Sequence, residues 1–227
     1  MSAPPHLIQL DVGLLANFVT LIGADDGACA VLDPAFEVDR VLAEVRRRGW
    51  RVVAILVTHT HEDHIEGVAA CAAAAAAAGA GADIPVHVGA AEAAALRQHA
   101  PAARIIEVHG GETIAIGTAE VRALATPGHT LAGMTWLGDG FACTGDVLFV
   151  GSCGRSDLEP GGDPRALWRS LQLLATLPEE TRIYPGHDYG PTPTSTIAWE
   201  LLHNPCFRQP DEASFTRWQR LREASGS

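Results

Sequence analysis

Short runs of apolar and β-branched residues, separated by turns that contain Gly and Asp, open the chain. Three such runs predict strands, at residues 7–10, 18–22 and 29–32. Apolar residues at helical spacing then predict a helix over residues 38–48 that stops at Gly49. The continuous apolar run at residues 52–57 predicts a buried strand, and a polar cluster beginning at Thr58 stands at its C-terminal end.

Alanine, the best helix former, dominates the next segment, which predicts a helix from Val68 to near Gly79. Further strands are expected at residues 86–88, 113–116, 121–126, 135–137, 141–144 and 182–184. Further helices are expected at residues 164–174, 198–203 and 215–224. Strands and helices do not alternate strictly, so the order favours an α/β sandwich of two mixed sheets with helices outside, in one domain over residues 1–227.

The composition narrows the chemistry that the chain can perform. All 16 basic residues of the 227-residue chain are arginine, so reactions that need a lysine amine are excluded. The 27 acidic residues give a formal charge of -11, which argues against broad contact with nucleic acid or an anionic membrane. The only basic run, at residues 46–48, falls at a predicted helix C-terminus, where it complements the helix dipole.

The cysteines and the N-terminal segment bear on the cellular location. Five scattered cysteines form no Cys-x-x-Cys pair, which is typical of reduced thiols in a cytosolic protein. The first residues lack a basic patch followed by an apolar run, and no apolar stretch reaches the roughly 18 residues that a membrane span needs. We therefore expect a cytoplasmic protein without membrane contact.

The strongest chemical signal is the segment at residues 58–64, Thr-His-Thr-His-Glu-Asp-His. It brings His59, His61, Asp63 and His64 together directly after a buried strand. Imidazole nitrogen and carboxylate oxygen are ligands of borderline-soft divalent metals, and hydrolytic sites leave one position open for water. Such dense packing of ligand types suits two adjacent metal ions.

Three more ligand-type residues stand beside glycines in turns that follow apolar runs. They are His129 in Pro-Gly-His-Thr, Asp146 in Thr-Gly-Asp, and His187 in Pro-Gly-His-Asp. Glycine lets the backbone approach a site closely, and loops after strands often carry function. A single such histidine is usually an ordinary loop residue, but the whole set favours a metal site.

This order of His-x-His-x-Asp-His, His129, Asp146 and His187 resembles the metallo-β-lactamase superfamily over nearly the whole chain. The resemblance implies an αββα four-layer sandwich with the metals at one edge of the two sheets. It also implies a first metal on His59, His61 and His129, a second on Asp63, His64 and His187, and Asp146 between them. True β-lactamases of the superfamily lack that aspartate, so antibiotic hydrolysis is disfavoured.

A narrower resemblance is to glyoxalase II and to its sister group, the persulfide dioxygenases. It is carried by the Thr-Gly-Asp segment that ends in Cys-Gly-Arg-Ser-Asp at residues 144–157, by Tyr-Pro-Gly-His-Asp-Tyr at residues 184–189, and by Asn204-Pro205. Both groups act on glutathione-linked compounds, which implies a small-molecule partner of that kind. Arg155 stands where glyoxalase II has a lysine, and a bidentate guanidinium suits a substrate carboxylate, although an ion pair with Asp157 is an equal alternative.

Two reactions fit one ligand set. As a hydrolase, the chain would hold two zinc, iron or manganese ions and lower the pKa of a bound water to about 7, and Asp63 would also take up the proton. A thioester suits this chemistry because its thiolate leaves without a dedicated acid. As a dioxygenase, the chain would hold one Fe(II) on His59, His129 and Asp146. We place the hydrolase first, because all seven ligand types of a dinuclear site are present.

Several further expectations complete the sequence interpretation. Tyr189 can face the site from the turn that carries His187, although such a tyrosine is more often packing. Asp33 ends an early strand and is a candidate neighbour of the metal ligands. Nucleic-acid processing, a third function found with such metals, is disfavoured by the net charge of -11. The sequence leaves open whether the chain forms a homodimer.

Overall fold

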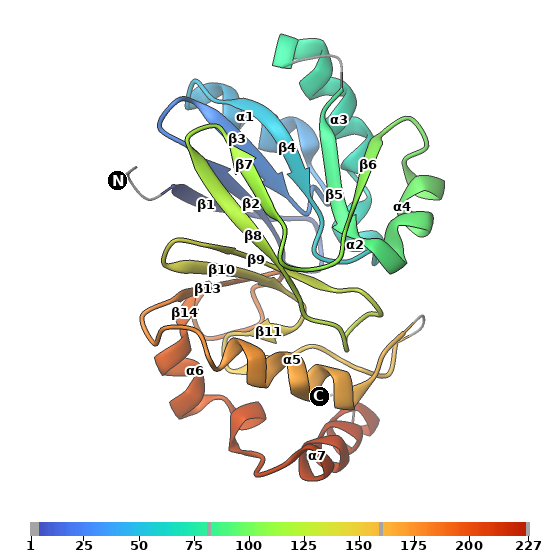
Figure 1. The fold of residues 1–227 in the computed structure, drawn as a ribbon, viewed down its shortest axis with the longest axis vertical. Helices are drawn as coiled ribbons and strands as arrows, with labels where there is room; N and C mark the ends of the chain where they lie inside the picture. Colours follow the sequence, from blue (N-terminus) through green and yellow to red (C-terminus); the bar gives the residue numbers. More distant parts are fainter. Residues whose placement is uncertain (1–4, 81–82, 159–160, 226–227) are drawn as a thin grey trace.

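The structure is a computed structural model that describes residues 5–80, 83–158 and 161–225. Its strands form two six-stranded sheets that face each other (Figure 1). The first sheet has the strand order β1-β2-β3-β4-β5-β6. These strands are β1 His6–Val12, β2 Asn17–Gly23, β3 Ala28–Leu32, β4 Arg51–Leu56, β5 Pro85–Gly89 and β6 Arg104–Val108.

The second sheet has the strand order β14-β13-β10-β9-β8-β7. These strands are β7 Thr113–Ile116, β8 Ala119–Ala125, β9 Met134–Gly138, β10 Phe141–Gly145, β13 Arg182–Pro185 and β14 Ser195–Thr196. A small hairpin, β11 Leu148–Phe149 with β12 Ser152–Cys153, lies beyond β10. Both large sheets are mixed. In the first, β1 pairs antiparallel with β2 and β3 pairs in parallel with β4; in the second, β9 pairs antiparallel with β10 and β10 pairs in parallel with β13.

Helices cover the two outer faces of the pair of sheets (Figure 1). On the first sheet and its connections lie α1 Val38–Arg47, α2 Glu62–Ile65, α3 Val68–Ala75 with the π-helical turn η1 Ala76–Ala80, the 3-10 turn η2 Ala90–Glu92, and α4 Ala93–His99. On the second lie α5 Pro164–Leu174, α6 Ile197–His203, the 3-10 turn η3 Pro205–Arg208 and α7 Glu212–Ala224. Within the described ranges, no helix combines the length and the apolar character that crossing a bilayer requires.

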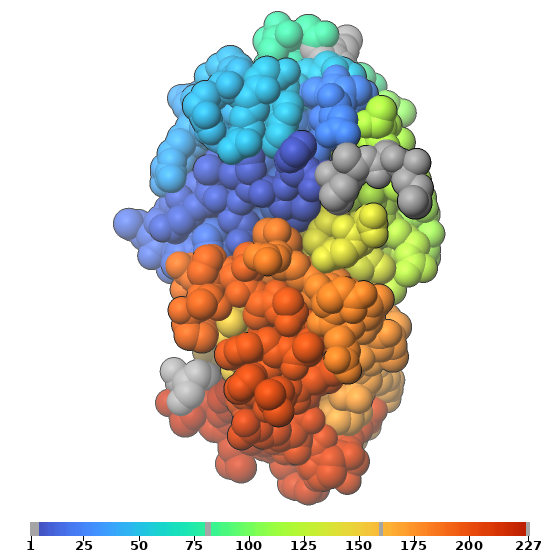
Figure 2. Space-filling model, turned by 90° about the vertical axis from the view of Figure 1, so that its left-hand side faces the viewer, coloured from blue at the N-terminus to red at the C-terminus, as the bar shows by residue number. Residues whose placement is uncertain are grey.

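Three apolar layers hold the helices and sheets together. Side chains of β3 alternate between two of them, because successive residues of a strand point to opposite faces. Cys29 and Val31 pack toward the helices of the first sheet, whereas Ala30 and Leu32 pack between the sheets. A third layer joins the second sheet to α5 and α7, with Phe215 fully buried. In Figure 2 the blue N-terminal segments accordingly lie above the orange and red C-terminal helices.

The predicted αββα sandwich is confirmed, and most predicted strands lie within two residues of the observed ones. The pattern missed α2, α4, β6 and the two-residue strands β11, β12 and β14. β6 lies at the edge of its sheet and is only partly buried, so its sequence shows one apolar pair, Ile105 and Ile106, and no longer run. The predicted helix end near Gly79 agrees with the structure, where Gly79 has φ 85° and breaks the helical geometry.

Candidate metal centre

The predicted ligands come together because each follows the C-terminal end of a strand. His59 lies just beyond β4, His129 beyond β8, Asp146 directly after β10, and His187 just beyond β13. The two sheets are joined at this edge by backbone hydrogen bonds from Met134 N to Thr58 O (2.7 Å) and from Phe18 N to Gly186 O (2.7 Å). The fold therefore delivers residues from both sheets to one place.

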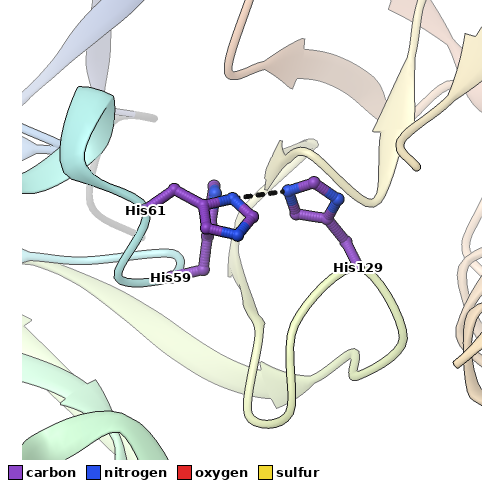
Figure 3. Close-up of side chains that lie close together, drawn as sticks. All are labelled: His59, His61 and His129. Atoms are coloured by element: carbon purple, nitrogen blue, oxygen red, sulfur yellow. Dashed lines mark hydrogen bonds between the residues drawn. The ribbon is translucent and has the colours of Figure 1, made fainter. Parts of the chain in front are cut away.

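Three histidines form the first cluster, which we call the first triad: His59, His61 and His129 (Figure 3). The Nε2 of His129 lies 3.0 Å from the Nδ1 of His61. The ring of His59 stands edge-on to both of the others, with centroid distances of 4.7 Å to His61 and 4.8 Å to His129. One ligand atom from each residue lies within 4.8 Å of the others, which is the spacing that a shared ion requires.

Asp63, His64 and His187 form the second triad. The short helix α2 carries Asp63 and His64 as consecutive residues, and His187 approaches them from the second sheet. The Nε2 of His187 lies 3.1 Å from the Nε2 of His64 and 3.4 Å from the Oδ2 of Asp63. His64 and His187 are buried, whereas the Asp63 side chain is 23% exposed and so remains in reach of solvent.

Asp146 lies between the two triads. Its Oδ2 is 3.6 Å from the Nε2 of His129 and 3.3 Å from the Nε2 of His187, and its Oδ1 is 3.4 Å from the Nε2 of His64. One carboxylate thus reaches both triads, as the resemblance implied. All seven residues that were predicted as ligands are brought together.

The atoms inside this cluster fit divalent cations. The Nε2 of His59 is buried and has no hydrogen-bond partner among the described residues, and the same holds for the Oδ1 of Asp146. A buried polar atom without a partner is costly, and a bound cation would satisfy both of these atoms. Imidazole nitrogens and carboxylate oxygens are the donors that Zn²⁺, Fe(II) and related ions accept.

The electrostatics of the cluster differ from one ligand to the next. Burial lowers the pKa of His59 well below its usual value, so the imidazole is neutral and its lone pair is available. Burial raises the pKa of Asp146, but the facing His64 and other imidazoles outweigh it and hold that pKa well below the ordinary range. Burial lowers the pKa of His64, but Asp146 and Asp33 outweigh it and raise that pKa well above the usual value, so a metal ion bound there would have to displace the proton of this ring.

Each of four ligand rings is held through the nitrogen that faces away from the cluster. Nδ1 of His59 contacts Thr58 Oγ1 (3.0 Å), and Nδ1 of His129 contacts the carbonyl of Arg155 (2.7 Å). Nδ1 of His64 contacts Asp33 Oδ2 (3.0 Å), and Nδ1 of His187 contacts the carbonyl of Leu15 (2.9 Å). Such contacts fix the ring orientation and leave Nε2 pointing inward.

Asp33 and Asn17 support the ligand loops from behind. The carboxylate of Asp33 accepts hydrogen bonds from Thr58 N (2.7 Å) and Thr58 Oγ1 (2.6 Å), besides its contact with His64. Its position at a strand end had marked it as a candidate neighbour. Asn17, which the sequence interpretation missed, donates to the carbonyl and the Oδ2 of Asp63, both at 3.0 Å. It starts an ordinary strand, so no motif marks it.

The two predicted substrate contacts differ in their surroundings. The guanidinium of Arg155 makes a bidentate pair with Asp157, at 2.8 and 2.7 Å, and is half-exposed. Tyr189 stacks on His187 with ring centroids 4.5 Å apart and planes 10° apart, and its side chain is 57% exposed. Arg155 is therefore engaged by a neighbour, whereas Tyr189 stands over a ligand ring as an exposed residue.

Comparison with known proteins places this geometry in a family. The profile of the Metallo-beta-lactamase superfamily matches residues 12–187. A hydroxyacylglutathione hydrolase from Vibrio cholerae is 35% identical over 189 residues, which are 83% of this chain and 67% of that protein. The chain spans between about half and two thirds of the length of the curated relatives it matches.

Two solved structures are also similar. The crystal structure of ETHE1 from Myxococcus xanthus has a TM-score of 0.81 and 30% identity, and covers 95% of this chain and 90% of its own. That of TTHA1623 in a di-iron-bound form has a TM-score of 0.69 and 30% identity, and covers 87% and 98%. The matched residues run from within β1 to His187, the last predicted ligand. The chain belongs to the metallo-β-lactamase superfamily.

Proposed function

We propose that this chain is a metal-dependent hydrolase that cleaves a thioester of the hydroxyacylglutathione type. The observation that carries the proposal is the pair of complete triads with Asp146 between them. Seven side chains suffice for two divalent ions, with zinc, iron and manganese all compatible with these donors. The di-iron form of TTHA1623, a protein of similar fold, supports a count of two.

The residues of the chain divide the work of such a hydrolysis. When bound, the two ions would supply hydroxide near neutral pH and polarise the thioester carbonyl. Asp63 is the proposed proton acceptor, because Asn17 holds its Oδ2 while the side chain stays 23% exposed. The thiolate leaving group has a pKa of about 8.5 and needs no dedicated acid. The proposed chemical steps thus use only the seven candidate ligands, with Asn17 holding Asp63.

The glutathione part of the substrate would lie against Tyr189 and Arg155. Burial, together with the charges of Asp146 and Asp63, raises the pKa of Tyr189, so its phenol stays protonated and can donate a hydrogen bond. Arg155 would share its guanidinium between Asp157 and a substrate carboxylate. The 35% identity to a hydroxyacylglutathione hydrolase supports this class of substrate.

All five cysteines are buried and free, which supports a cytoplasmic location.

A second candidate is a mononuclear Fe(II) persulfide dioxygenase. The likeness to ETHE1, at a TM-score of 0.81, favours it. His59, His129 and Asp146 would hold the iron, since two histidines and one carboxylate form the usual face of such sites. The other four residues, His61, Asp63, His64 and His187, would then orient ligands and solvent. The contacts of His187 with His64 and Asp63 suit them to this role.

Parallel assays on one anaerobic preparation distinguish the two reactions. We expect thiol release from S-lactoylglutathione, followed with a thiol reagent, and no oxygen uptake with glutathione persulfide. The reason is that only the hydrolase uses both triads. Oxygen uptake without thiol release would contradict the proposal and establish the second candidate.

A matched thioester serves as the control for the glutathione assignment. The same acyl group on N-acetylcysteamine keeps the thioester and lacks both glutathione carboxylates. Because a hydrogen bond to a charged group is worth about 1.5 to 3 kcal/mol, its KM is expected to be at least roughly tenfold higher. Equal KM values for the two thioesters would show that Arg155 binds no substrate anion.

A further inference from the structure

The first triad spans two loops that are far apart in sequence. His59 and His61 belong to the loop after β4, and His129 belongs to the loop between β8 and β9. The distance of 3.0 Å between His61 Nδ1 and His129 Nε2 depends on how these loops are held relative to each other. Two imidazole nitrogens at this distance need a cation or a shared proton between them. The affinity for a cation therefore depends on the distance between these two nitrogens.

The side chain of Glu92 connects the two loops directly. Its Oε2 accepts from the backbone N–H and the hydroxyl of Thr60, at 2.7 and 2.9 Å. Its Oε1 accepts from the hydroxyl of Thr130 at 2.6 Å and from the N–H of Ala132 at 2.8 Å. Thr60 lies between His59 and His61, and Thr130 follows His129. Each carboxylate oxygen therefore serves one ligand loop.

The backbone that carries Glu92 is itself fixed against the His129 loop. A Cβ atom on Gly89, at the end of β5, would lie only 2.0 Å from the carbonyl oxygen of Ala132. Only glycine, which has no Cβ, allows the two backbone segments to approach this closely. Glu92 follows in the 3-10 turn η2 and reaches the loops from this anchored position.

The carboxylate is also a buried charge. Glu92 is 6% exposed, and its four hydrogen bonds come from neutral donors, with no ion pair to any residue in the described part of the chain. Burying a carboxylate is costly unless hydrogen bonds satisfy it, and these four bonds satisfy both oxygens and hold the group in one orientation.

We propose that Glu92 is a positioning residue for the first triad, which sets the spacing of His61 and His129 and thereby the affinity for the ion held there. This inference rests on the proposed metal site, and it does not depend on which reaction the site performs. Glu92 touches no ligand ring, so it acts through Thr60, Thr130 and Ala132.

Glu92→Gln tests the proposal with little change in volume. The amide has a single oxygen, so its NH₂ group must face the donors of one loop. Zinc affinity is measured by competition with a chromophoric chelator, in a His187→Ala background that disables the second triad. We expect a 10- to 100-fold weaker affinity, roughly the loss seen when a group that orients metal ligands is removed. In a His61→Ala background, the same change should leave the affinity for the remaining ion unaltered.

Glu200→Gln is the matched control. Glu200 is likewise a buried carboxylate, and it accepts from Gly151 N (3.0 Å) and Asn204 Nδ2 (2.7 Å), away from both ligand loops. The Glu200→Gln substitution should lower the midpoint of thermal unfolding and leave zinc affinity unchanged. If Glu92→Gln does not fold, Thr130→Val removes one of the four donors while keeping the shape, and a several-fold loss of zinc affinity is expected.

Two results would overturn the inference: wild-type zinc affinity in Glu92→Gln, or an equal loss of affinity in Glu200→Gln. No substrate enters the measurement. A protein that binds zinc as expected but releases no thiol would therefore contradict the proposed hydrolysis alone, and the role of Glu92 would stand.

Discussion

Replacing His64 with alanine is expected to abolish thioester hydrolysis. The change removes one ligand of the second triad, the contact with Asp33 at 3.0 Å, and the neighbour of Asp146 at 3.4 Å. Loss of a group that merely orients a metal ligand costs about 10- to 100-fold, so loss of the ligand should lower kcat by at least ~100-fold. Steady-state thiol release, together with the number of ions per chain, measures the effect.

His87→Ala is the control for this variant. His87 lies on β5, is half-buried, and stands edge-on to Trp136 at 6.4 Å, outside both triads. It should change stability and leave kcat and ion content at the wild-type level. Full activity of His64→Ala would refute the dinuclear hydrolase. Retention of one iron together with oxygen uptake would instead be the signature of the mononuclear dioxygenase.

Gly186→Ala is expected to disrupt the centre by adding a single methyl group. A Cβ atom there would lie 2.4 Å from Asp146 Oδ1 and 2.8 Å from His64 Cε1. The backbone cannot shift to relieve the clash, because Gly186 N donates to Gly145 O (2.9 Å) and Gly186 O accepts from Phe18 N (2.7 Å). The carboxylate between the two triads must move, so we expect loss of at least one ion and a fall in kcat comparable to that of His64→Ala.

Gly140→Ala separates this clash from the general effect of losing a glycine. Gly140 has φ +75° in the turn between β9 and β10, and an added Cβ atom would meet nothing within 4 Å. Alanine there should cost about 1 to 2 kcal/mol of stability through backbone strain and leave the ion content unchanged. Equal ion content in Gly186→Ala and wild type would show that Asp146 does not need its observed position.

The ligands could be predicted from the sequence because each one follows a recognisable strand. A run such as residues 52–57 marks a buried strand, and polar residues directly after it must lie at one edge of the sheet. The motif then supplies His59, His61, Asp63 and His64 within six consecutive residues. The same reasoning extends to Asp146 after β10 and explains why both the fold and the ligand cluster agree with the structure.

The supporting residues could not be predicted in this way. Glu92 lies in an alanine-rich segment, 32 residues from Thr60 and 38 from Thr130, and looks like a solvent-facing helix residue until the loops are placed around it. Asn17 has the same difficulty, since it contacts Asp63 across 46 residues. For Arg155 the sequence left two partners open, and the structure shows the pair with Asp157, while the substrate contact stays a proposal.

The number of ions per chain tests the central claim most directly. Protein purified without oxygen and without added chelator is analysed for zinc, iron and manganese, and the total is divided by the protein concentration. Seven side chains in two triads with Asp146 between them predict two ions per chain. A single iron per chain, unaffected by His64→Ala, would contradict the dinuclear site.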